Sequence, residues 1–97
     1  MVRYKVKADR VEENVRLVKD VFAQLAKEKP EGVRYATFKL EDGVSFMHVA
    51  RIDTTDGSNP LVVLEAFKKF SGTIKERCDE TPVTTSLETV GAYRAFE

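Results

Sequence analysis

The side chains of this chain best suited to acid-base or nucleophilic chemistry are its single histidine, His48, and its single cysteine, Cys78. A neutral imidazole in an apolar site accepts a proton from a phenol or a quinol, which makes His48 a candidate general base. The alternative is a histidine whose ring is satisfied by a neighbouring hydroxyl or carbonyl within an apolar layer. Because His48 is one titratable residue without a partner motif, this alternative is the more frequent case.

The sequence predicts neither a metal site nor a cofactor site. His48 and Cys78 are far apart in the chain and supply no ligand spacing. Cys78 lies at helical spacing from apolar residues, with no base near it in the sequence, so we expect it to be a small buried hydrophobe. The glycines Gly43, Gly57 and Gly72 are isolated and do not have the spacing of a phosphate-binding loop.

Length and composition limit the classes of partner. The 97 residues make one domain, residues 1–97, and 16 basic side chains balance 16 acidic ones. A net charge of zero argues against a nucleic-acid partner and against an anionic membrane surface. The lone cysteine excludes an internal disulfide, and the chain shows neither the apolar core of a signal peptide nor a run long enough to span a membrane. We therefore expect a cytoplasmic protein.

The stretch that positions His48 reads as a β-hairpin over Val33–Arg51. Two runs rich in β-branched and aromatic residues flank the three-residue loop Glu41–Gly43. The glycine suits the loop position that takes a positive φ. If the residues next to the loop, Leu40 and Val44, face each other, the strand register follows for the whole hairpin.

This register divides the hairpin into two faces. It pairs Ala36 with His48, Phe38 with Phe46 and Tyr35 with Val49. One face is then nearly all apolar and is expected to contact helices: Ala36, Phe38, Leu40, Val44, Phe46, His48 and Ala50. The other face is mixed: Val33, Tyr35, Thr37, Lys39, Ser45, Met47, Val49 and Arg51. Small residues around His48 on the first face predict a pocket beside the imidazole.

The segments before the hairpin predict a strand and a helix. Apolar and basic residues alternate over residues 2–7, which is typical of a strand with one buried face. From Asp9 onward, apolar residues recur at steps of three and four, which predicts an amphipathic helix of about 20 residues. Pro30 to Gly32 ends this helix.

The segments after the hairpin predict a second helical region and a last strand. Asn59 and Pro60 form a helix start, with one helix to about Phe70 and a short piece to Arg77. The last strand is expected over Val83 to Phe96. Its apolar phase slips, which predicts a bulge near residues 88–89.

The predicted order β-α-β-β-α-β is typical of an α+β, ferredoxin-like fold with an antiparallel sheet and both helices on one face. The opposite face of the sheet is then too apolar to be left to water. A second copy is the simplest cover, so we expect a homodimer. The expected interface residues are Tyr35, Thr37, Met47 and Val49.

Three short stretches carry a resemblance to a known group. They are Glu31–Tyr35 at the second strand, Phe46–Val49 in the third, and the aromatic stretch Ala92–Phe96 near the end. Together with the layout, they resemble the dimeric α+β barrel superfamily, and within it the small proteins related to antibiotic-biosynthesis monooxygenases. The resemblance spans essentially the whole chain.

The resemblance implies a cofactor-independent monooxygenase-like enzyme that acts on a small aromatic or polyketide-like substrate between the sheet and the helices, with His48 as the base. The residues expected to bind this substrate are Tyr4, Ala36, Phe38, Phe46 and Phe67. Core packing is the more common use of such aromatic side chains. The chain contains no tryptophan, on which the haem-degrading relatives rely, so haem is not an expected substrate. The alternative function is a non-catalytic ligand-binding or interaction module of the same dimeric fold.

Overall fold

The computed structural model describes residues 1–95. A short 3-10 turn, η1, precedes the first helix, and the second helical region is divided in two. The elements are β1 (Val2–Val6), η1 (Ala8–Arg10), α1 (Val11–Glu28), β2 (Val33–Lys39), β3 (Ser45–Ile52), α2 (Glu65–Gly72), α3 (Ile74–Arg77) and β4 (Cys78–Thr84).

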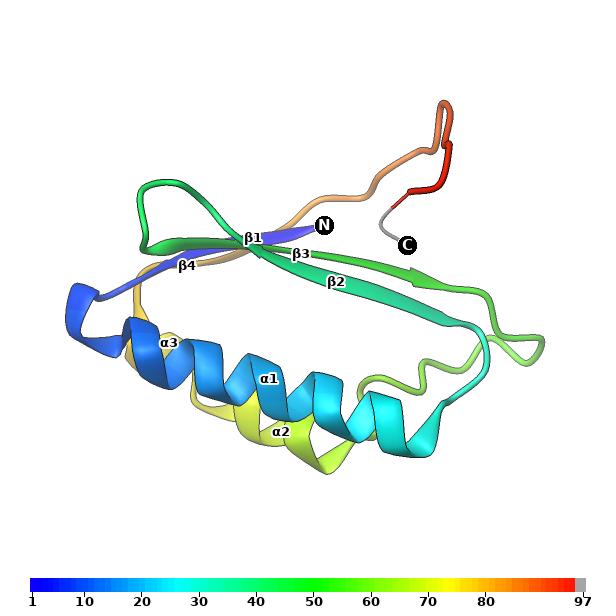
Figure 1. The fold of residues 1–97 in the computed structure, drawn as a ribbon, viewed down its shortest axis with the longest axis horizontal. Helices are drawn as coiled ribbons and strands as arrows, with labels where there is room; N and C mark the ends of the chain where they lie inside the picture. Colours follow the sequence, from blue (N-terminus) through cyan, green and yellow to red (C-terminus); the bar gives the residue numbers. More distant parts are fainter. Residues whose placement is uncertain (96–97) are drawn as a thin grey trace.

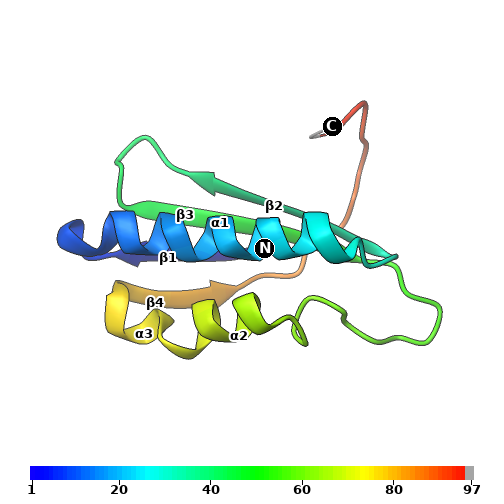
Figure 2. The ribbon, with the colours of Figure 1, turned by 60° about the horizontal axis from the view of Figure 1, so that its bottom comes forward.

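The four strands form one open antiparallel sheet in the order β2-β3-β1-β4. Figure 1 shows the helices on one face of this sheet, with none on the other. In the turned view of Figure 2, α1 and α2 lie side by side in front of the sheet. The predicted α+β class with an antiparallel sheet is therefore confirmed. In residues 1–95, no helix has both the length and the apolar character needed to cross a membrane.

The predicted register of the hairpin is wrong by one residue. Thr37, not Ala36, pairs with His48, and Phe38 pairs with Met47 rather than with Phe46. Side chains alternate along a strand, so a shift by one residue moves every side chain of β2 to the opposite face.

The cause of the shift is the side chain of Asp42 in the loop. Its Oδ1 accepts hydrogen bonds from the backbone N–H groups of Val44 (3.0 Å) and Ser45 (2.8 Å), and its Oδ2 accepts one from the Ser45 hydroxyl (2.5 Å). These bonds close a loop of four residues, 41–44, in place of the expected three, and Leu40 N–H donates to the carbonyl of Ser45 across it. Gly43 takes the expected positive φ, +77°.

The corrected register rearranges the two faces of the sheet. Tyr35 and Thr37 lie with His48 on the face that the helices cover, so their predicted place on the uncovered face is wrong. Ala36 and Phe38 lie on the uncovered face, so their predicted place beside His48 is wrong as well. The open face, as we call the uncovered one, thus carries an apolar set from β2 and β3: Ala36, Phe38, Met47 and Val49.

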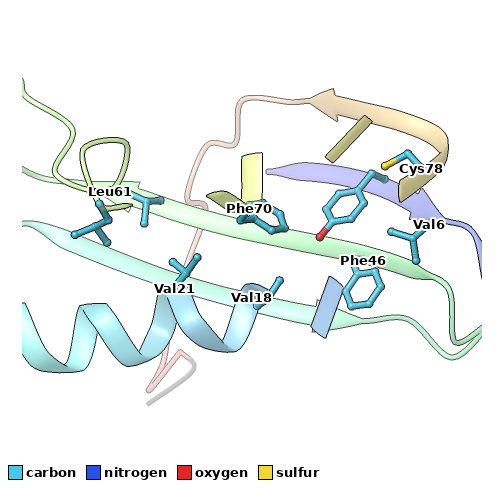
Figure 3. Packing of buried hydrophobic residues seen from close by; sticks show 9 residues of the cluster. Val6, Val18, Val21, Phe46, Leu61, Phe70 and Cys78 are labelled. Carbon is cyan, nitrogen blue, oxygen red and sulfur yellow. The ribbon is translucent and has the colours of Figure 1, made fainter. Parts of the chain in front are cut away.

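The core lies between the sheet and the helices. Figure 3 shows Val18 and Val21 of α1 directed toward Phe46 of β3 and Phe70 of α2. The cluster is completed by Tyr4, Val6, Leu61, Leu64 and Cys78. Cys78 is buried, as its apolar neighbours in the sequence predicted.

The second helical region begins later than predicted. The Asn59 side chain accepts the N–H of Leu61 (3.0 Å), but residues 60–63 form turns and α2 starts at Glu65. Near that start, Oε1 of Gln24 in α1 accepts the N–H of Ala66 (2.9 Å), which satisfies a helix-terminal donor. The predicted break before the short piece ending at Arg77 is confirmed.

The last strand is shorter and earlier than predicted. β4 begins at Cys78 and pairs with β1, and Thr85 N–H donates to the carbonyl of Met1 (2.7 Å) at its end. Residues 85–95 form no strand. The irregularity in the pairing of β4 with β1 lies opposite residues 3–6 of β1, so the bulge predicted near residues 88–89 is not there. Phe96 lies outside the described residues.

Candidate functional site

His48 lies in β3, where three hydroxyl groups surround its ring. Nε2 is 2.7 Å from the Tyr4 hydroxyl, and Nδ1 is 2.5 Å from the Tyr35 hydroxyl and 3.0 Å from that of Thr37. The residue is 5% exposed. Both ring nitrogens therefore have hydrogen-bond partners, and neither is open to a substrate in this arrangement.

The hydrogen bonds continue from Tyr4 into the helices. Nδ2 of Asn14 in α1 donates to the Tyr4 hydroxyl (2.9 Å), and Nε of Arg77 in α3 donates to Oδ1 of Asn14 (3.0 Å). Asn14 and Arg77 are both 0% exposed. The guanidinium also donates to the Thr73 hydroxyl (2.5 Å) and to the carbonyl of Phe70 (2.8 Å).

Arg77 fixes the direction of this series of hydrogen bonds, because a guanidinium donates and never accepts. The oxygen of the Asn14 amide must face Arg77, so its NH2 group donates to Tyr4. The Tyr4 oxygen accepts from Asn14, so we expect the buried Tyr4 hydroxyl to donate its own hydrogen to its other partner, Nε2 of His48. A neutral imidazole with an accepting Nε2 carries its hydrogen on Nδ1. We call this series, from Arg77 through Asn14 and Tyr4 to His48, the buried relay.

Burial sets the protonation states of the buried relay. It lowers the pKa of His48 to about 4, so the imidazole is neutral near pH 7. It raises the pKa of the Tyr4 phenol above its ordinary value and that of Tyr35 to about 12, so both phenols keep their hydrogens. Burial also lowers the pKa of Arg77, but a guanidinium remains charged.

Aromatic rings occupy the space around the imidazole. The ring centroids of Tyr4 and Phe70 both lie 5.2 Å from that of His48, and the Tyr35 centroid lies 5.7 Å away. The expected pocket bounded by Ala36 and Phe38 is not formed there, since both residues lie on the open face.

The predicted substrate-binding residues are thus only partly brought together. Tyr4 contacts His48 directly and stacks on Phe46 with 5.6 Å between centroids. The ring of Phe67 lies next to Phe70 rather than next to His48, with 6.0 Å between the Phe67 and Phe70 centroids. Phe46 is part of the core.

Sequence reasoning missed Asn14 and Arg77. A signal for both exists in the chain. Asn14 interrupts the apolar stripe of α1, where it lies three and four residues from Val11 and Val18. Arg77 continues the stripe that runs through Phe70 and Ile74. A polar residue on a buried stripe needs a buried partner.

A groove lies next to the relay, between the C-terminal half of α1 and the start of β2. It has a volume of about 360 Å³, and its lining includes Phe22, Leu25, Lys29, Pro30, Val33 and Tyr35. Tyr35 joins the groove to the relay, because its ring lines the groove and its hydroxyl contacts His48. The ring is held by stacking on Phe22, with 5.1 Å between centroids and 13° between planes.

In residues 1–95, no group of three or more His, Cys, Asp or Glu side chains is arranged to hold a metal ion. Comparisons of the chain with protein-family models, curated proteins and solved structures return no match.

Proposed function

We propose that this protein is a homodimeric module that binds small aromatic molecules, with a ferredoxin-like protomer of the dimeric α+β barrel kind. The element order and the antiparallel strand order β2-β3-β1-β4 support the ferredoxin-like description. The binding site in this proposal is the groove between α1 and β2 rather than the space beside His48. The observation that carries the proposal is the position of Tyr35, whose ring lines the groove and whose hydroxyl contacts the buried His48.

The open face supports the homodimer. Ala36, Phe38, Met47 and Val49 are only partly buried within the protomer. The C-terminal segment leaves the sheet on this side (Figure 1) and carries exposed apolar residues, with Leu87 59%, Val90 99% and Tyr93 84% exposed. A two-fold dimer would bury both apolar surfaces with a single chain type.

Sedimentation of a charge variant tests the dimer. Met47→Lys places a charge on the open face, which would be desolvated in a dimer, and is expected to give monomer or aggregate at micromolar concentration. Val62→Lys is the matched control, because Val62 is 47% exposed and precedes α2 on the helix side. A wild-type protein that sediments as a folded monomer at this concentration would contradict the dimer.

A thermal-shift screen of phenols, quinols and aromatic acids tests binding in the groove. Ala26→Trp should fill the groove and abolish any stabilisation by a ligand, because Ala26 is part of the lining. Ala23→Trp is the control on the same helix, since Ala23 is also exposed but lies outside this lining. Equal ligand responses in the two variants would place the ligand elsewhere.

The second candidate function is a cofactor-independent monooxygenase-like activity on an aromatic or polyketide-like substrate. In this reaction one oxygen atom of O2 enters the substrate, and the other leaves as water with two substrate hydrogens. The buried relay favours this candidate, because its last residue, His48, contacts Tyr35, which lines a groove large enough for such a substrate. Oxygen uptake on a quinol that binds, lost in His48→Gln, is the expected result. If the quinol binds but no oxygen is taken up, the result favours the non-catalytic binding function.

A further inference from the structure

The hydroxyl groups at the end of the buried relay have one hydrogen more than they can use. His48 Nδ1, Tyr35 and Thr37 contribute three hydrogens, and Nδ1 cannot accept because it is protonated. Its hydrogen goes to one hydroxyl oxygen, and only one of the two hydroxyls can then donate to the other. One hydroxyl hydrogen is left without an acceptor among the described residues.

Tyr35 is the member of this pair that lies in the groove, since it is part of the groove lining and Thr37 is not. Both hydroxyls contact Nδ1 of His48, so either oxygen can accept its hydrogen. Tyr35 is half-buried, so of the two hydroxyls that of Tyr35 is the one next to a ligand in the groove.

The second polar group of the groove is also a donor. Lys29 ends α1 in the left-handed conformation (φ +46°), and its backbone N–H is used by the carbonyl of Leu25 (2.8 Å). The lining includes Lys29 and no acidic residue. Among the ion pairs of the described residues, none includes Lys29.

We infer that the groove binds an aromatic carboxylate, whose ring lies against the apolar lining of Phe22, Leu25 and Val33 and whose carboxylate accepts from Tyr35 and pairs with Lys29. The one charged residue of the lining is a cation, Lys29, which favours an anionic ligand. The volume suits a molecule of one or two rings. This inference rests on the proposed small-molecule-binding function and gives it a ligand class.

Titration calorimetry with two probes tests the class on the intact chain. The probes are 1-naphthoate and 1-naphthalenemethanol, which share the ring system and differ in charge. We expect naphthoate to bind about 10-fold more tightly, as a hydrogen bond to a charged group adds to the apolar contact. Lys29→Met should weaken naphthoate about 2–5-fold and leave the alcohol unchanged, because Lys29 is exposed. Tyr35→Phe should weaken naphthoate about 10-fold.

Two matched variants control for general effects. Lys27→Met removes an exposed cation of the same helix that is outside the groove lining, and Tyr93→Phe removes an exposed hydroxyl. Neither should change naphthoate binding. If Tyr35→Phe does not fold, Lys29→Met still decides the charge.

The failures of the two proposals are distinguishable. Equal affinity for the two probes, or naphthoate binding unchanged in Lys29→Met, overturns the carboxylate class while ligand binding stands. If neither probe binds at millimolar concentration, both proposals are overturned.

Discussion

Replacing Asn14 by leucine should destabilise the protein far more than an average substitution. The side chain is 0% exposed and links Arg77 to Tyr4 by hydrogen bonds of 3.0 and 2.9 Å. Leucine has a similar shape, so packing is nearly preserved, but the Arg77 Nε loses its acceptor and the Tyr4 oxygen loses its donor. A hydrogen bond to a charged group contributes about 1.5–3 kcal/mol and a neutral one about 1 kcal/mol. The free energy of unfolding should fall by about 2.5–4 kcal/mol, since neither group can reach water.

Urea melts measure this loss, and two further variants make it interpretable. Glu12→Leu changes an exposed residue of the same helix and should stay within about 0.5 kcal/mol of the wild type. Adding Arg77→Met to Asn14→Leu removes the stranded charge, so the double variant should lose at least about 1 kcal/mol less than the sum of the two single losses. A loss below about 1 kcal/mol in Asn14→Leu, or simple additivity in the double variant, would refute the buried relay.

Two other predictions concern His48 and the hairpin. The folded pKa of His48, about 4, lies below the ordinary value of 6.5, so the unfolded chain binds an extra proton between these values. The contribution of His48 to the free energy of unfolding is therefore fully present above about pH 6.5 and falls by about 3 kcal/mol as the pH drops to about 4. Urea melts of the wild type and of His48→Gln at each pH separate this loss from the effects of carboxylates. Ala36→Leu should change the free energy of unfolding by less than about 0.5 kcal/mol at protein concentrations where the chain is monomeric, because Ala36 lies on the open face; a loss of 1–3 kcal/mol, the cost of overpacking, would place it in the core.

The fold could be predicted where one face of an element was clearly apolar. Val2, Tyr4 and Val6 alternate with basic residues, and Tyr4 and Val6 are buried as this pattern implies. The faces of β2 could not be predicted in this way, because both sets of alternating side chains contain apolar groups. The register then depended on the loop, where the side-chain hydrogen bonds of Asp42 add one residue to the turn. Side-chain hydrogen bonds in a loop can thus outweigh the hydrophobic pattern of the strands, and here they set the register of the hairpin.

The candidate site was harder to predict than the fold. The sequence identifies His48, because it is the one histidine of the chain and chemically distinct, and it leaves open a ring satisfied by neighbouring hydroxyls. Its partners come from β1, β2, α1 and α3, which are distant in sequence. Asn14 and Arg77 each stood out on an apolar stripe, but no sequence pattern states that two such residues meet. That meeting depends on how the helices cross the sheet.

The tautomer of His48 tests the buried relay most directly. Long-range ¹H–¹⁵N NMR of the imidazole at pH 7 distinguishes a protonated Nδ1 from a protonated Nε2. Because Arg77 sets the direction of every donor along the chain, the expected spectrum is that of a neutral ring with its hydrogen on Nδ1, unchanged down to about pH 5. A ring protonated on Nε2, or one that titrates near pH 6.5, would contradict the relay and with it the donor that Tyr35 presents to the groove.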